Sequence, residues 1–291
     1  MTSSAHSNLV DDDHYAQAFA AFLRRLDYPD ALFGWLDQRF QHNGARSLLC
    51  IGAGTGSVEL PMLERMSELV RVDMIEPNPA HADALERALL DHPRLSSQVH
   101  RTVYEQWSPP AGSAHDVILF CNSLYFLPTP GRMLGRALTQ LAPGGQLLII
   151  HEHPMGAMYR IQTRYHETTQ TTAGRAVYYT AADILDDLLS LQTDPASGID
   201  VLDVRLEVEH ATLDVRDYPR PVLEFLFETA IRTDADYRAK VAFIRSMYAS
   251  TRLPQPYSVI TVTRPASSGA RPGLTAEQSP PVHRGLGLGA R

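Results

Sequence analysis

Short apolar runs alternate with longer amphipathic stretches through the first half of the chain. The apolar runs predict strands at residues 47–51, 71–75, 98–102, 116–121 and 146–151, and the amphipathic stretches predict helices at 58–66, 79–90 and 131–141. Buried parallel strands have near-continuous apolar sequences, and helices of this length form the crossovers between them. The pattern therefore predicts a doubly wound α/β sheet.

Further elements are predicted on both sides of this core. Apolar positions recur at helical spacing in two lead-in helices, at 15–26 and 32–40, and later helices are predicted at 180–191, 221–229 and 234–248. The segments 201–213 and 258–263 alternate or are β-branched, which predicts an antiparallel pair at the sheet edge. The polar stretch 155–179 shows no regular pattern, so we interpret it as a substrate-facing insertion.

These elements predict one domain over residues 1–264. It comprises a helical lead-in at 10–45, a cofactor-binding core at 46–153 and substrate-facing insertions at 154–200 and 215–255. Residues 265–291 are rich in Pro, Gly and Ser with little apolar content, which predicts a disordered tail.

Composition narrows the functional classes. The 291 residues are 44% hydrophobic, enough for one substantial core, and the net charge of −7 disfavours a nucleic-acid partner. Cys50 and Cys121 each lie in an apolar run, as reduced core thiols do. The start of the chain does not resemble a signal peptide, and no apolar run is long enough to span a membrane. We therefore expect a cytoplasmic protein with no membrane partner.

A glycine-rich turn follows the first predicted strand. Residues 47–51 run directly into Gly52, Gly54 and Gly56, and a helix is predicted next. Glycines let the backbone approach a ligand, and the amides at a helix N-terminus favour a polar or anionic group. The turn is typical of a nucleotide-class binding site, although a tight strand-to-helix connection has the same pattern.

The second predicted strand ends in Glu76. An acid roughly 20 residues after such a turn meets the ribose in folds of this type. A dinucleotide site and an adenosylmethionine site both place an acid here. The dinucleotide pattern requires its third glycine at position 57, where this chain has Ser57, so the spacing disfavours a dinucleotide.

Two later features complete the pattern. The fourth predicted strand ends in Asn122, followed by Tyr125 and Phe126, at the sheet edge where ligands of open α/β sheets bind. The two aromatic residues could equally pack against the next helix. Pro143 and Gly144 then end a helix and start the fifth strand.

The glycine turn, the acid and the Pro-Gly turn occur in the order found in class I S-adenosylmethionine-dependent methyltransferases, which residues 47–150 resemble. The whole chain is similar to the histamine N-methyltransferases, through the segments at 11–26, 75–81, 118–127, 178–189 and 253–263. This resemblance implies a Rossmann-like α/β fold: a mostly parallel seven-stranded sheet, helices on both faces and a small substrate-facing helical region. It also implies an enzyme that uses S-adenosyl-L-methionine as its cofactor.

The resemblance assigns site residues by position. The cofactor contacts that it implies are Gly52, Gly54, Gly56, Glu76, Pro77, His81, Thr102, Cys121 and Asn122. The substrate contacts that it implies are Tyr15, Phe19, Tyr28, Asn122, Tyr125, Phe126 and Gln255. The family has a glutamine where this chain has His81. It also has a glutamine where this chain has Asn122, and an asparagine where this chain has Gln255.

One substrate position departs from the family. The family's substrate-binding glutamate falls at Tyr28, although Asp27 or Asp30 would supply a charge after a small shift. The acceptor expected from the resemblance is therefore broader than histamine: an imidazole, an amine or an amino-acid-like compound.

Methyl transfer requires a nucleophile to be held in line with the methyl group. We expect Asn122, Gln255, Tyr15 and Tyr125 to orient a small-molecule acceptor, and a neutral nitrogen needs no strong base. An alternative is an O- or C-methyltransferase in which His151 or His153 is the general base. Alternation along the strand turns Glu152 away from both histidines, so we expect no metal site. A non-catalytic cofactor-binding protein is a third hypothesis, and the sequence is compatible with a monomer or a homodimer.

Overall fold

The computed structural model describes residues 12–40, 44–110, 113–169, 179–194, 199 and 202–264. The predicted tail at 265–291 and the central part of the insertion, residues 170–178, lie outside these ranges. No helix in the described ranges is both long and apolar enough to cross a membrane.

The core is the predicted sheet, with strand order β3-β2-β1-β4-β5-β9-β6. Its strands are β1 (Ser47–Ile51), β2 (Arg71–Ile75), β3 (Ser96–His100), β4 (His115–Cys121), β5 (Leu141–Glu152), β6 (Asp203–Glu209) and β9 (Tyr257–Thr263). The first five strands are parallel, whereas β9 runs antiparallel to both β5 and β6. The seven-stranded, mostly parallel sheet is therefore confirmed.

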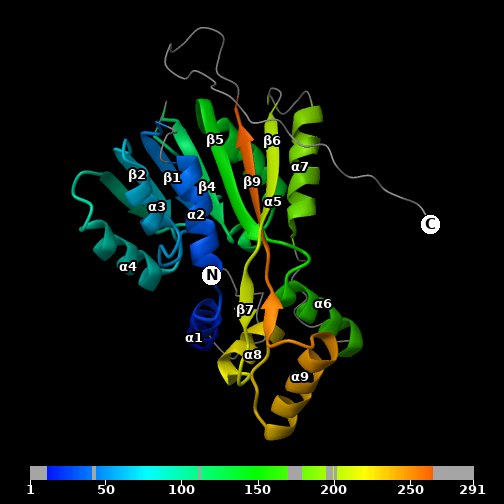
Figure 1. The fold of residues 1–291 in the computed structure, drawn as a ribbon. Helices are drawn as coiled ribbons and strands as arrows, with labels where there is room; N and C mark the ends of the chain where they lie inside the picture. Colours follow the sequence, from blue (N-terminus) through cyan, green and yellow to red (C-terminus); the bar gives the residue numbers. More distant parts are fainter. Residues whose placement is uncertain are drawn as a thin grey trace.

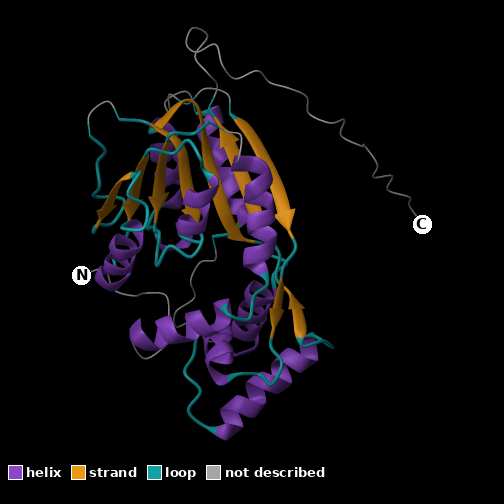
Figure 2. Ribbon diagram, turned by 60° about the vertical axis from the view of Figure 1, so that its left-hand side comes forward, coloured by secondary structure: helices purple, strands orange, loops and turns teal. Residues whose placement is uncertain are grey.

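Helices cover both faces of the sheet (Figures 1 and 2). Successive side chains of a strand point to opposite faces, so Leu48 and Cys50 of β1 pack on one side while Leu49 and Ile51 pack on the other. The first face is covered by α2 (Tyr28–Phe40), α3 (Glu59–Arg65) and α4 (Pro79–Leu89), and the second by α5 (Pro130–Thr139) and α7 (Ala181–Thr193). Each face buries its own apolar cluster.

A smaller helical region lies beneath the edge at which the parallel strands end (Figure 1). It comprises α1 (Asp12–Leu23), α6 (Ala157–Thr169), α8 (Arg220–Phe227), α9 (Asp234–Met247) and a two-stranded sheet of β7 (Thr212–Asp214) and β8 (Arg252–Pro254). Phe22 and Phe225 join α1 to α8, with ring centroids 4.6 Å apart. This region covers the edge of the sheet that carries the candidate ligand site.

Several predicted elements need correction, among them the fifth strand, which begins at Leu141 rather than at residue 146. The third strand is Ser96–His100 rather than 98–102, because its polar first residues pair with β2 at the sheet edge. The stretch predicted to be irregular contains α6, whose buried side chains pack the helical region. The segment 201–213 is divided between two sheets: β6 pairs with β9, while β7 turns away and pairs with β8.

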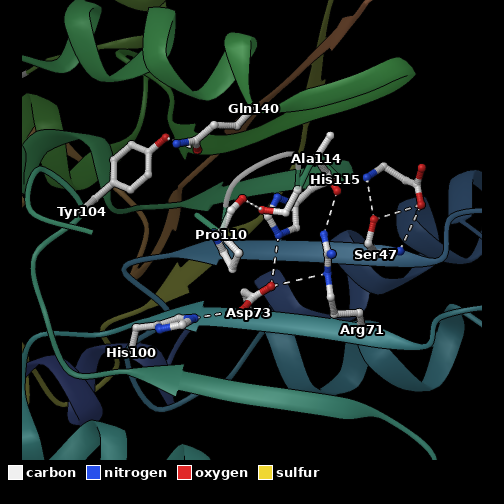
Figure 3. A network of polar contacts seen from close by, with 11 residues as sticks. Ser47, Arg71, Asp73, His100, Tyr104, Pro110, Ala114, His115 and Gln140 are labelled. Carbon is white, nitrogen blue, oxygen red and sulfur yellow. Dashed lines mark hydrogen bonds and ion pairs between the residues drawn. The ribbon is translucent and has the colours of Figure 1, made fainter. Parts of the chain in front are cut away.

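A polar network crosses the face of the sheet around β2 (Figure 3). The Asp73 carboxylate bonds His100 through Oδ1 at 2.8 Å and His115 through Oδ2 at 3.1 Å, both at Nε2 of the imidazole. Arg71 Nε lies 3.5 Å from Asp73 Oδ2. Burial alone raises the pKa of Asp73, but the hydrogen bonds from the two histidines outweigh it, so the pKa is lowered.

Candidate active site

The glycine turn after β1 combines a packed position with an open one. Gly56 has φ of +80°, and a methyl group there would lie 2.7 Å from Leu60 Cγ and 2.8 Å from Leu85 Cδ2. Gly54 has φ of +56°, yet a methyl group there would meet no atom of the described residues within 4 Å, its two chain neighbours aside. Packing therefore requires glycine at position 56, whereas Gly54 faces space that a ligand can fill.

Glu76 at the end of β2 is fixed against this turn. Its Oε2 accepts a hydrogen bond of 2.8 Å from the Gly54 amide, and its Oε1 accepts one of 2.8 Å from the Asn78 amide. The residue is 5% exposed. His81 Nδ1 lies 3.8 Å from Glu76 Oε1, and this carboxylate raises the pKa of His81. The structure therefore brings together the turn, the acid and His81.

Glu59, which the sequence patterns did not single out, adds a second carboxyl group here. It is the first residue of α3 and is 4% exposed, and its Oε2 accepts a hydrogen bond of 3.3 Å from the Val58 amide. Burial raises the pKa of Glu59 to about 7, and the nearby charge of Glu76 adds to this. A phosphate at this helix N-terminus would meet a carboxyl group, which disfavours a dinucleotide.

The end of β4 forms the next part of the site. Cys121 Sγ lies 3.9 Å from the Tyr28 hydroxyl, and the Tyr28 ring packs on Tyr257 of β9 with centroids 3.8 Å apart. Asn122 has φ of +48°, and its amide donates to the Ile150 carbonyl at 2.8 Å. A left-handed non-glycine residue costs roughly 1–3 kcal/mol and is often found at functional sites. Both cysteines are free, as predicted.

Three other predicted residues, Tyr125, Phe126 and Phe19, make contacts between aromatic rings. Tyr125 packs between Phe126 and His151, with centroid distances of 4.5 and 5.5 Å, while Phe126 is 54% exposed. Phe19 packs on Phe225 of α8, with centroids 5.3 Å apart.

Three predicted contacts remain to be placed. Thr102 is half-buried just after β3, and Pro77 is exposed just after Glu76. Tyr15 belongs to α1, but its side chain lies outside the described part of the chain.

Gln255 is buried with both ends of its amide engaged. It is 1% exposed. Its Oε1 accepts a hydrogen bond of 2.9 Å from the Met158 amide, and its Nε2 donates one of 2.7 Å to Glu152 Oε1. Gln255 thus joins the end of β5 to the start of α6. The sequence could not reveal these two contacts.

His151 and His153, at the end of β5, have different hydrogen-bond partners. His151 is 1% exposed, and its Nε2 donates to the Tyr179 carbonyl at 2.5 Å. His153 instead accepts a hydrogen bond of 3.1 Å from the Met155 amide. Burial lowers the pKa of both imidazoles. In the described ranges, no three His, Cys, Asp or Glu side chains are placed to hold a metal ion.

A cleft of about 520 Å³ lies elsewhere, in the helical region. It is lined by Arg25, Arg216, Asp217, Tyr218, Arg245 and Thr251. None of the predicted site residues lines it, so we place the candidate active site at the sheet edge instead.

Comparison with known sequences gives one partial match. No protein-family model matches the chain. A segment of 174 residues is 27% identical to CymA, a candidate nonribosomal peptide synthetase of Salinispora arenicola. The match covers 55% of this chain but 2% of CymA.

Several solved structures share the fold. A candidate methyltransferase of Bacillus halodurans is 16% identical with a TM-score of 0.57, covering 80% of this chain and 98% of the other. The YcgJ protein of Bacillus subtilis is 8% identical with a TM-score of 0.56 over the same shares. The plantazolicin methyltransferase BpumL, solved with S-adenosylhomocysteine, is 13% identical with a TM-score of 0.52, covering 89% and 93%. The chain therefore has the Rossmann-like fold of class I methyltransferases.

Proposed function

We propose that this protein is an S-adenosylmethionine-dependent methyltransferase that acts on a small molecule. The observation that carries the proposal is the hydrogen bond between the Gly54 amide and Glu76, which sets an acid beside an open glycine turn. A carboxylate fixed in this way can accept hydrogen bonds from both hydroxyls of a ribose. The turn leaves space for the rest of the ligand at Gly54.

The charges near the turn favour adenosylmethionine over a dinucleotide. Glu59 and Glu76 both lie at this edge, and the basic side chain of His81 lies 3.8 Å from Glu76 Oε1. A pyrophosphate would be repelled by the two acids, whereas a sulfonium cation would be attracted. BpumL, which shares the fold, was solved with the demethylated form of this cofactor.

Adenosylmethionine, when bound, supplies an electrophilic methyl group on its sulfonium. We assign Glu76 to the ribose and the turn of Gly52, Gly54 and Gly56 to the methionine portion. Pro77, His81, Thr102, Cys121 and Asn122 are further proposed contacts. Burial raises the pKa of the Cys121 thiol, so Cys121 would pack against the ligand as an uncharged group.

We assign the acceptor to the space below the end of β4. Asn122, held in a fixed backbone conformation, would orient the acceptor with Tyr125, while Tyr28 and Tyr257 would form an aromatic wall that excludes water. Gln255 would act by holding Glu152 in place, since both ends of its amide are occupied. Tyr15, Phe19 and Phe126 remain proposed substrate contacts.

A nitrogen acceptor fits this arrangement, because a neutral nitrogen needs no base. We propose an imidazole, an amine or an amino-acid-like compound as the acceptor. The partial match to a peptide synthetase supports an amino-acid-like acceptor. Histamine itself is a weaker candidate, because Tyr28 stands at the position of the expected carboxylate and its ring is buried.

One observation favours the O- or C-methyltransferase alternative. His151 donates from Nε2 to a carbonyl, and its buried Nδ1 has no hydrogen-bond partner among the residues that the structure describes. An oriented imidazole with an available lone pair can act as a general base. In that alternative, His151 is therefore a stronger candidate for the general base than His153.

Calorimetric titration with adenosylmethionine and with NAD tests the proposal. We expect only adenosylmethionine to bind, and Glu76→Gln should weaken it by roughly 10- to 100-fold, the effect of a lost hydrogen bond to a charged group. Glu64→Gln, at an exposed position of α3, is the matched control and should bind like the wild type. Binding of NAD alone, or an unchanged affinity in Glu76→Gln, would overturn the proposal.

A further inference from the structure

The strand β6 forms one edge of the main sheet, next to β9 (Figure 1). Its seven residues, Asp203–Glu209, pair with β9 in one continuous antiparallel register, so the strand contains no bulge. It also contains no proline, and it has no second neighbour among the strands that the structure describes. A regular edge strand presents unpaired N–H and C=O groups that can form a ladder with another strand. The backbone of β6 can therefore accept a further strand.

One face of β6 carries an exposed apolar stripe. Side chains alternate along a strand, so Val204, Leu206 and Val208 lie on the same face. Val204 packs against the apolar cluster under α5 and α7, whereas Leu206 is 45% exposed and Val208 is 37% exposed. The exposed residues of β3, at the opposite edge of the sheet, are all polar. Exposed apolar side chains on an edge strand favour contact with another apolar surface.

The other face of β6 carries charges of both signs. Arg205 and Glu207 lie there, two residues apart and both exposed. Glu207 Oε2 accepts a hydrogen bond of 2.8 Å from Trp35 Nε1 of α2, which holds the carboxylate on this face. Arg205 Nη2 lies 2.9 Å from Asp203 Oδ2, and both of these side chains are more than half exposed. A partner strand can therefore reach the arginine and the glutamate.

A second copy of β6 complements both faces when the two strands run antiparallel about a two-fold axis at Leu206. Residues directly opposite each other in an antiparallel pair lie on the same face of the sheet. In this register Leu206 meets Leu206 of the second copy, and Val204 meets Val208, so the apolar stripe is continuous. Arg205 meets Glu207 of the second copy. A two-fold interface repeats every contact, so this pair of opposite charges forms twice.

Other registers of the same pairing fit less well. An axis at either neighbour of Leu206 sets two identical charged residues opposite each other, and like charges in that position repel. An axis at Val204 or Val208 leaves only three residues of each strand paired within β6. The register at Leu206 does set Asp203 against Glu209, but this pair lies at the strand ends, where water and salt screen the repulsion.

We propose that the protein forms a homodimer in which two β6 strands pair antiparallel about Leu206 and join the two sheets into one. The proposal does not depend on the methyltransferase activity. The charges on β6 favour a second copy over an unrelated strand, because an unrelated strand does not set opposite charges against Arg205 and Glu207. The contact consists of one strand pair and a narrow apolar stripe, so the interface is small and the dimer dissociates on dilution.

Sedimentation velocity of the full chain, between about 1 and about 300 µM, tests the proposal. We expect the wild type to change from monomer to dimer over this range. Arg205→Glu sets two acids opposite each other and Glu207→Arg sets two arginines, so each variant should dimerise at least about tenfold more weakly. An equal mixture of the two variants should form a heterodimer, because each β6 strand then meets the opposite charge at both positions.

A substitution at the axis provides a second test. Leu206→Lys places two ammonium groups opposite each other and should remain monomeric over the same range. Leu90→Lys, at the end of α4, replaces a side chain that is 77% exposed and is the matched control, which should dimerise like the wild type. The proposal is overturned if the wild type stays monomeric, if Leu206→Lys still dimerises, or if the mixed charge variants associate no better than either variant alone.

Discussion

Replacing Gly54 or Gly56 with alanine tests which glycine of the turn is needed for ligand binding and which is needed for packing. Both residues have positive φ, so alanine at either position costs about 1–2 kcal/mol in backbone strain. At position 56 the new methyl group would also lie within 3 Å of Leu60 and Leu85, and overpacking adds about 1–3 kcal/mol. At position 54 the methyl group meets no atom within 4 Å in the described part of the chain, its two chain neighbours aside.

Urea denaturation and adenosylmethionine titration would be measured on both variants. We expect Gly54→Ala to fold with a free energy of unfolding lower by about 1 kcal/mol, yet to bind adenosylmethionine at least tenfold more weakly. Gly56→Ala should instead lose about 3 kcal/mol of stability. If Gly54→Ala binds the cofactor as the wild type does, the space at Gly54 is not the cofactor site and the reasoning is wrong.

Two further predictions concern the fold. Asp73→Asn removes the carboxylate charge and replaces one of the two oxygens that bond His100 and His115 with an N–H donor, and it should lower the free energy of unfolding by about 3 kcal/mol at pH 7. Because the pKa of Asp73 is lowered in the folded protein, this stabilisation is present above the unfolded pKa and is lost as the pH falls through the folded pKa. Urea denaturation at pH 7 and below pH 4 checks the trend, and a difference that does not shrink with acid contradicts it. Thr180→Ala removes the N-cap residue of α7, where the Thr180 amide and hydroxyl both bond Asp183, and should lower the melting temperature through a loss of about 1 kcal/mol. An unchanged melting temperature would show that tertiary packing alone fixes the start of α7.

The sequence predicted the elements whose structure depends mainly on residues close together along the chain. The strands β1 and β2 have the predicted bounds, because each is a short apolar run buried on both faces. Glu76 was found because it directly follows such a strand, and its hydrogen bond to Gly54 confirms that the acid and the turn lie together. The predicted cap of α7 at Thr180 is also present.

Elements that depend on distant contacts were not predictable in this way. The helix α6 is polar along most of its length, and its buried face contains Gln162 and His166, which no hydrophobic pattern reveals. The strands β7 and β8 are three residues each, too short to give an alternating pattern.

The same limit holds for single residues. Gln255 and Glu152 are 103 positions apart along the chain, and their hydrogen bond exists only because the fold brings the two residues together. Tyr28 is a further example. The resemblance predicts that it contacts substrate, and the structure shows that its buried ring packs on Tyr257, a contact that no local pattern reveals.

A crystal structure of the complex with S-adenosylhomocysteine tests the central claim most directly. We predict that Glu76 binds the ribose hydroxyls and that the amino-acid portion lies along the turn at Gly52 and Gly54. A ligand bound in the arginine-lined cleft, or elsewhere away from Glu76, would contradict the account.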